Sequence, residues 1–179
     1  MLLCNSNFKK LHNKDDKMKK NFYNISKDIL ENEEYQKLKN ISHHGINRYD
    51  HCYRVAHYTY SITKALHLNC EEATRAALLH DFFTDEVEEE NKLNKLIKHP
   101  EYALENSKKH FELSDMQEDI IKSHMFPIGK NVPKYAESWV VDIADDVAAV
   151  YEKCFTLRKE LTAATTFLFI LLINYIKMI

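Results

Sequence analysis

Residues 69–83 read NCEEATRAALLHDFF, and this stretch decides how the chain folds. Asn69 followed three residues later by Glu72 is typical of a capping box at the start of a helix. Alanines at positions 73, 76 and 77 then share one face with His80, because residues three and four apart lie together on a helix. Small alanines let a neighbouring helix approach closely. The stretch therefore predicts a helix that packs His80 against another helix.

Upstream of this stretch, a helix is expected from about Tyr49 to Leu66. Val55 and Ile62 repeat there at helical spacing, and His51 lies one turn before Val55, which places it on the inward stripe. Gly45 marks a turn before this helix.

The N-terminal residues 1–24 are rich in Lys and Asn and lack steady periodicity. This composition predicts a poorly ordered or loosely packed arm. Ser26 is expected to cap the helix that follows the arm.

Downstream, three further helices are expected. Pro100 suits the first turn of a helix, which would place His99 at its N-terminal edge. Ser114 with Gln117 resembles a second capping box, which would open another helix. His124 lies on the inward face of that helix. A helix over about residues 137–154 follows.

Composition supports an all-α fold. The 179 residues include only 2 Gly and 3 Pro, whereas β-hairpins and phosphate-binding loops both need glycine-rich turns. The formal net charge of −2 gives no basic field for binding nucleic acid. The four cysteines show no paired spacing and the start of the chain lacks a signal-peptide core, so we expect reduced thiols in a cytoplasmic protein.

Histidines are concentrated in one part of the chain. Nine of the ten lie between His43 and His124, several of them on inward stripes. A single buried histidine is usually a satisfied core residue. Several buried His and Asp side chains on different helices indicate a metal site, because each is costly to bury unless it is paired or bound to a metal.

These residues resemble the HD-domain superfamily, whose pattern H…HD…D lies on a helical bundle. His51 in NRYDHCYRVAHY and His80-Asp81 in RAALLHDFF match the first histidine and the pair. A late aspartate follows in YAESWVVDIADDVAAVYE, and the contexts of His99 (KHPEYALENSKKHF) and His124 (DIIKSHMFPI) match as well. The resemblance spans about residues 30–155 and implies an all-α HD-domain bundle of a small bacterial type.

Three aspartates compete for the late position. On a helical wheel built from the apolar residues of 140–148, Asp142 points away from the apolar centre, and Asp145 lies slightly nearer to it than Asp146. The family pattern, in which the ligand follows an apolar residue and an alanine, selects Asp145. Asp142 and Asp146 are then expected to be surface charges.

The set resembles the two-metal members of the superfamily. By this resemblance the first metal is held by His51, His80, Asp81 and Asp145, and the second by Asp81, His99 and His124. Mixed imidazole and carboxylate ligands suit two divalent ions of Fe, Mn, Zn, Co or Ni.

The resemblance implies a metal-dependent phosphohydrolase that cleaves a small phosphoester such as a nucleotide, with His80 and Asp81 as catalytic residues. Many two-metal members continue the pair as HDIGK, whereas here Phe83 and Thr84 stand at the Gly and Lys positions. This departure disfavours a cyclic-dinucleotide phosphodiesterase and an inositol-oxygenase-like enzyme. A di-iron oxygenase with the same ligands and a non-catalytic metal-binding signalling module are the alternatives.

Substrate contacts are expected just before the first ligand. Arg48 could grip a phosphate through its planar guanidinium, with His44 beside it, and a surface arginine at a helix start is the alternative.

Three regions are expected along the chain: the arm at 1–24, the HD domain at 25–157 and an apolar C-terminal helix at 158–179. Residues 163–173 are almost entirely apolar, and a run this short favours a buried helix over a membrane span. We expect this helix to pack on the domain or on a second copy of the chain. In the second case the protein would be a homo-oligomer.

Overall fold

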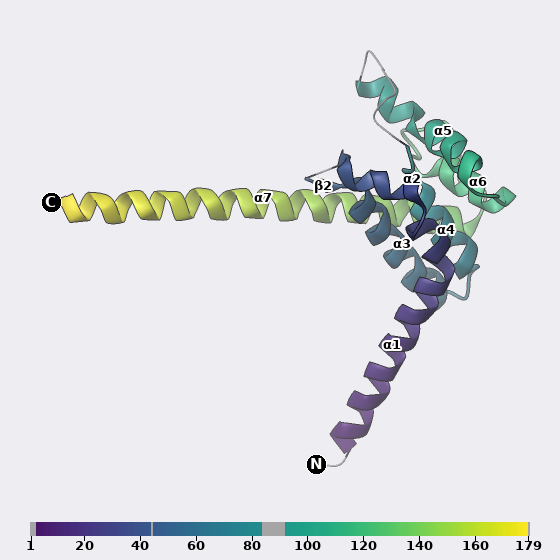
Figure 1. Ribbon diagram of the computed structural model, residues 1–179, viewed down its shortest axis with the longest axis horizontal. Coiled ribbons are helices and arrows are strands. Elements are labelled where there is room, and N and C mark those ends of the chain that lie inside the picture. Colours follow the sequence, from purple (N-terminus) through teal and green to yellow (C-terminus); the bar gives the residue numbers. More distant parts are fainter. Residues whose placement is uncertain (1–2, 44, 84–91, 179) are drawn as a thin grey trace.

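The computed structural model describes residues 3–43, 45–83 and 92–178. The helices are α1 (Leu3–Leu30), α2 (Glu33–Gln36), the 3-10 helix η1 (Lys37–Asn40), α3 (Arg48–Ala65), α4 (Cys70–Leu79), α5 (Lys92–His110), α6 (Asp115–Ser123) and α7 (Ala136–Met178). Two short strands, β1 (Ser42–His43) and β2 (Ile46–Asn47), pair in an antiparallel hairpin. The prediction of an all-α bundle is confirmed (Figure 1).

Helix α4 lies at the centre of the bundle, in contact with α1, α3, α6 and α7. Its three alanines, Ala73, Ala76 and Ala77, are fully buried, as expected for a face that a neighbouring helix approaches closely. The Asn69 side chain accepts a hydrogen bond from the backbone N–H of Glu72, which confirms the predicted cap. The cap fixes the start of α4, and the last residues of the helix, Leu78 and Leu79, are buried in the core.

Helix α1 corrects the predicted helix start at Ser26. One helix runs through residue 24 to Leu30, and Ser26 lies inside it rather than at a cap. The Ser26 hydroxyl donates to the carbonyl of Phe22 (2.7 Å), a bond that lets serine sit within a helix. Only the C-terminal part of α1 packs on the bundle, through Phe22 and Ile29, while its N-terminal part projects away (Figure 1).

Gly45 turns the chain between β1 and β2 with a φ of +88°, which confirms its predicted place in a turn. A Cβ atom there would lie 2.5 Å from the Thr156 hydroxyl of α7. The hairpin therefore leads into α3 while packed closely against α7.

Helix α5 corrects the placement of Pro100. The proline lies inside the helix, so His99 is buried in the middle of α5 instead of at an N-terminal edge. A proline within a helix removes one backbone hydrogen bond and is tolerated where packing compensates for the loss. Pro100 is itself buried, which is consistent with such compensation.

Helix α7 is a single helix of 43 residues that begins in the bundle and continues beyond it (Figure 1). Its inward face consists of Val141, Ala144, Ala148 and Glu152, whereas Ile143 and Val147 are 55% and 53% exposed. The helical wheel built from residues 140–148 therefore placed the inward face of α7 at the wrong angle around the helix. Asp142 is correspondingly buried, contrary to the surface position expected for it, while Asp146 is exposed as expected.

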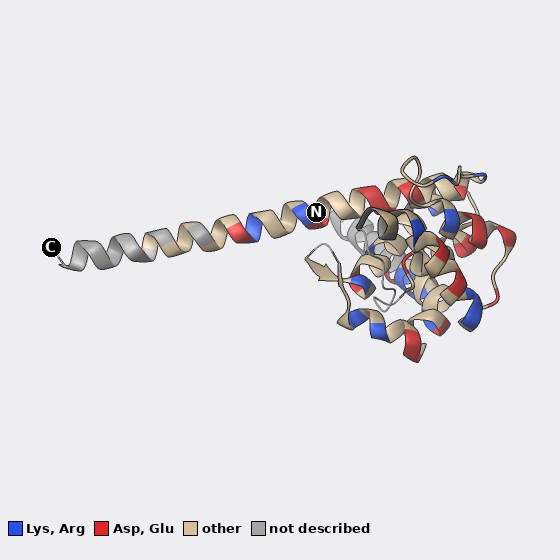
Figure 2. Ribbon diagram, turned by 90° about the horizontal axis from the view of Figure 1, so that it is seen from above, with Lys and Arg blue, Asp and Glu red and all other residues tan. Residues whose placement is uncertain are grey.

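The described side chains of the C-terminal region do not pack on the bundle. Leu161, Phe167 and Phe169 are 59–64% exposed, and few charges accompany them along the projecting helix (Figure 2). Within the described residues, no helix combines the length and the apolarity needed to span a membrane. Packing of this region on a partner stays a prediction.

Candidate metal centre

The six predicted ligands meet in the interior of the bundle, although they come from five different segments. His51 lies on α3, His80 and Asp81 follow the last residue of α4, His99 lies on α5, His124 follows α6 and Asp145 lies on α7. Three overlapping groups have ligand atoms within 4.8 Å of one another: His51 with His80 and Asp81, His80 with His124 and Asp145, and Asp81 with His99 and His124. Each group could hold a metal ion.

Two of the histidines are positioned by the same local device. His80 caps the C-terminus of α4, and its Nδ1 lies 2.7 Å from the carbonyl oxygen of Ala77. His124 caps the C-terminus of α6, and its Nδ1 lies 2.8 Å from the carbonyl oxygen of Ile121. Because a carbonyl only accepts, Nδ1 carries the proton in both rings and Nε2 presents a lone pair to the centre.

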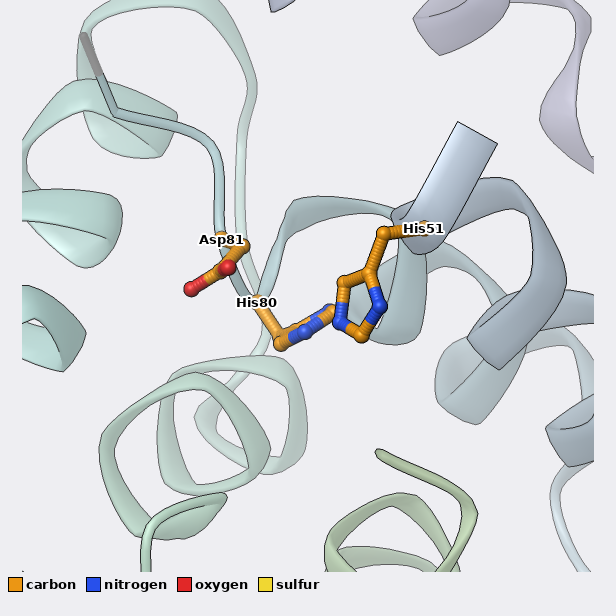
Figure 3. Close-up of side chains that lie close together, drawn as sticks. All are labelled: His51, His80 and Asp81. Carbon is orange, nitrogen blue, oxygen red and sulfur yellow. The ribbon is translucent and has the colours of Figure 1, made fainter. Parts of the chain in front are cut away.

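On the α7 side of the centre, His51 lies between two carboxylates. Its Nε2 is 2.9 Å from Oδ1 of Asp145, and its Nδ1 is 3.0 Å from Oε2 of Glu152. Burial opposes charge on the ring, but the two hydrogen bonds outweigh burial and raise the pKa of His51 to about 10. Figure 3 shows the rings of His51 and His80 directed toward each other, with their centroids 5.4 Å apart.

On the α5–α6 side, two histidines face each other and one carboxylate. Nε2 of His99 lies 2.8 Å from Nε2 of His124, and Oδ1 of Asp81 lies 3.3 and 3.8 Å from these two nitrogens. Burial and the neighbouring His99 and His80 lower the pKa of His124 to about 3. His124 is thus a neutral imidazole at ordinary pH, which is the form that binds metals.

Family comparison gives one match, and it covers all six of these residues. A model of the HD domain family matches residues 48–150. The chain belongs to the HD domain family. No curated protein and no solved structure matches it. Membership indicates a metal-dependent hydrolase superfamily, and the His/Asp groups of this HD domain could hold divalent metal.

A further observation indicates that the donor atoms of this HD domain fit a metal ion. The Nε2 atom of His80 is buried and has no hydrogen-bond partner. Oδ1 of Asp145 lies 3.6 Å from this atom. Burial lowers the pKa of His80, but the charge of Asp145 raises it overall, so a positive charge between the ring and this carboxylate is favourable. The residues present are therefore suited to the ion.

Arg48 is buried, so the surface arginine considered above is wrong. Its Nη1 donates to the carbonyl of Phe83 (2.7 Å), and its guanidinium lies over the Phe83 ring at 3.9 Å. Its Nε lies 3.8 Å from Oδ2 of Asp81. The guanidinium thus lies beside the Asp81 carboxylate. His44 and Thr84 lie outside the described residues.

Glu152 is the residue that the sequence reasoning missed. It is 1% exposed, holds Nδ1 of His51 and pairs with Arg54. The signal was available, because Val141, Asp145, Ala148 and Glu152 follow one another at helical spacing. A carboxylate behind a histidine fixes the tautomer and orientation of the ring, which is the usual arrangement behind metal-binding histidines.

Proposed function

We propose that this HD-domain protein is a metal-dependent phosphohydrolase that binds two divalent transition-metal ions and cleaves a small phosphoester such as a nucleotide. The observation that carries the proposal is the position of Asp81. This carboxylate belongs both to the group with His51 and His80 and to the group with His99 and His124. A carboxylate shared between two groups of histidines is suited to bridge two ions.

The two ligand sets are those that the family resemblance implies, and the three groups are compatible with them. The first ion is assigned to His51, His80, Asp81 and Asp145, and the second to Asp81, His99 and His124. On a six-coordinate metal both sets leave positions for water and substrate, and on a four-coordinate metal the set of three leaves one. Imidazole with carboxylate is suited to Fe, Mn, Zn, Co or Ni.

When bound, a pair of ions supplies a hydroxide at neutral pH and neutralises charge on the phosphoryl oxygens. The protein side chains have the tasks of holding the ions and orienting them. We assign His80 and Asp81 to the reacting centre, as the family resemblance implies. Each of them belongs to two of the three groups, as does His124. No nucleophile from the protein is needed for this chemistry.

Arg48 has a positioning role in this proposal. Its guanidinium is engaged by the carbonyl of Phe83 and lies beside Asp81. A direct grip on a substrate phosphate would require it to leave these partners. Holding Asp81 in place between the two groups is therefore the role that its geometry favours over substrate binding.

Elemental analysis of purified protein, followed by a panel of phosphomonoesters, phosphodiesters and nucleotides, tests the proposal. We expect about two transition-metal ions per chain and turnover that is equal under air and argon. Asp81→Asn should abolish both. His110→Gln changes an exposed histidine on the same helix as His99 and should change neither.

Other outcomes would overturn the proposal. A signal that requires oxygen and iron would indicate the oxygenase alternative. Tightly held metal with no turnover on any phosphoester would indicate a metal-binding module.

A further inference from the structure

The outer face of α7 carries an apolar stripe that has no partner among the residues that the structure describes. Its members are exposed side chains spaced alternately four and three residues apart: Ile143, Val147, Val150, Cys154, Leu157 and Leu161. We call these six residues the α7 seam. Ile143, Val150 and Leu161 are 55%, 63% and 59% exposed, so the stripe starts beside the bundle and continues onto the projecting part of the helix.

This spacing distinguishes the seam from scattered surface apolar residues. An alternation of four and three is the heptad repeat, which keeps one stripe facing a partner helix along a coiled coil. The sequence continues the same spacing through Ala164, Leu168 and Leu171. A repeat sustained over more than three heptads is the length that predicts a coiled coil. Bundle packing does not explain the seam, because the inward face of α7 is a different set of residues.

Charges beside the seam indicate what the partner is. In heptad terms, Lys153 and Glu160 occupy the same flanking position one heptad apart, and Arg158 lies on the opposite flank. All three are exposed. Charges at flanking positions set the partner and orientation of coiled coils. In a parallel pair of α7 helices, Lys153 would face Arg158 of the second copy, which is a repulsive contact.

Antiparallel pairing removes this repulsion. Flanking positions of the same kind then face each other, so Lys153 lies opposite Glu160 of the second copy, and two-fold symmetry makes this contact twice. The same register places Arg158 opposite the exposed Tyr151 ring of the second copy, a cation–π arrangement. It also places Cys154 opposite Leu157 of the second copy, and Val150 opposite Leu161 of the second copy.

We propose that the α7 seam is a homodimer interface, in which the projecting helix of each chain lies antiparallel along the outer face of α7 in a second copy. The seam from Ile143 to Leu161 is about 27 Å long at 1.5 Å per residue. Each tail covers the seam beside the partner's bundle and is covered in return. The metal centre faces the opposite side of α7, so the interface and the centre are separate.

Sedimentation equilibrium of the full-length protein tests the interface. We expect a dimer for the wild type and a monomer for Leu161→Asp, since a charge would be buried in the seam. Thr162→Asp is the matched control, because it adds the same charge at the next, outward-facing position and should leave the dimer intact. Both positions are exposed in the single chain, so neither substitution disturbs the bundle.

A charge exchange tests the orientation. Lys153→Glu should weaken the dimer about fivefold, and Lys153→Glu combined with Glu160→Lys should restore it, because two exposed pairs are first reversed and then rebuilt. A parallel dimer would instead be strengthened by Lys153→Glu, through attraction to Arg158, and that result would overturn the antiparallel arrangement.

A wild-type monomer at high protein concentration would overturn the interface itself. So would a monomer that floats with vesicles of anionic phospholipid through its C-terminal helix, because the seam would then be a membrane contact.

Discussion

The two sides of the metal centre are built from different chemistry. On the α7 side, His51 is held between Asp145 and Glu152, and its pKa is raised to about 10. On the α5–α6 side, His99 and His124 face each other with Asp81 as their shared carboxylate, and the pKa of His124 is lowered to about 3. One side has two carboxylates around one histidine, and the other has two histidines around one carboxylate.

This difference has a consequence for the two proposed ions. The α7 side offers four ligands with a carboxylate behind one of them, whereas the other side offers three. A site with more charged ligands and firmer support holds a divalent cation more strongly. We therefore expect the ion on the α7 side to stay bound when the ion on the α5–α6 side is lost, with Asp81 the residue on which both depend.

The largest effect is expected from Asp81→Asn. The amide keeps the size of the side chain but removes the charge that both sides share, so metal content should fall from about two ions per chain to nearly none, and turnover should be lost. Elemental analysis after gel filtration measures this, with circular dichroism to show that the fold is retained. If a folded variant kept both ions, the shared role of Asp81 would be wrong.

A selective effect is expected from His99→Gln, which removes a ligand from the α5–α6 side only. Metal content should fall to about one ion per chain and activity should drop sharply. The corresponding change on the other side, His51→Gln, should lower the affinity of the ion that is held more strongly. Titration with a chelator separates the two ions. Equal loss of both ions in His99→Gln would contradict two distinguishable sites.

A smaller effect is expected from Glu152→Gln. The glutamine can still reach Nδ1 of His51 but carries no charge, so metal affinity should fall about 10–100-fold, as is usual for residues behind the ligands. Competition with a coloured chelator measures the affinity. Glu105→Gln, at an exposed position on α5, is the control. An affinity unchanged in Glu152→Gln would remove that carboxylate from the support of the centre.

A further effect is expected in the pH dependence of the metal-free protein. The pKa of His51 is about 10 in the folded state, against an ordinary value of 6.5. The stability from its charged pairs is therefore complete below pH 6.5 and is lost as the pH rises from 6.5 to 10.

Thermal unfolding in the presence of a chelator should show Tm falling across this interval, and falling less in Glu152→Gln. A Tm that stays constant from pH 6.5 to 10, or a slope unaffected by Glu152→Gln, would contradict the charge state assigned to His51.

Much of the fold was predictable because local signals and packing agree. The caps at Asn69 and Ser114, the alanine face of α4 and the turn at Gly45 are all found where the sequence places them. The sequence prediction failed where tertiary contacts override local preference. Ser26 and Pro100 usually mark helix starts, yet both lie inside helices because packing continues the helix through them.

The six proposed ligands were predictable from their order and context, and the structure brings them together. Glu152 and Asp142 were missed for one shared reason. The wheel for α7 was centred on all its apolar residues, but Ile143 and Val147 belong to the outer seam. A helix with two apolar faces has no single apolar centre, so the inward positions of Asp142 and Glu152 emerged only from the three-dimensional packing.

Anomalous scattering from crystals of metal-loaded protein tests the central claim most directly. The account predicts two peaks on either side of the Asp81 carboxylate, one beside His51, His80 and Asp145, and the other beside His99 and His124. Chelation should remove the second peak first. A single peak, or a pair of peaks that does not share Asp81, would contradict the two-sided centre.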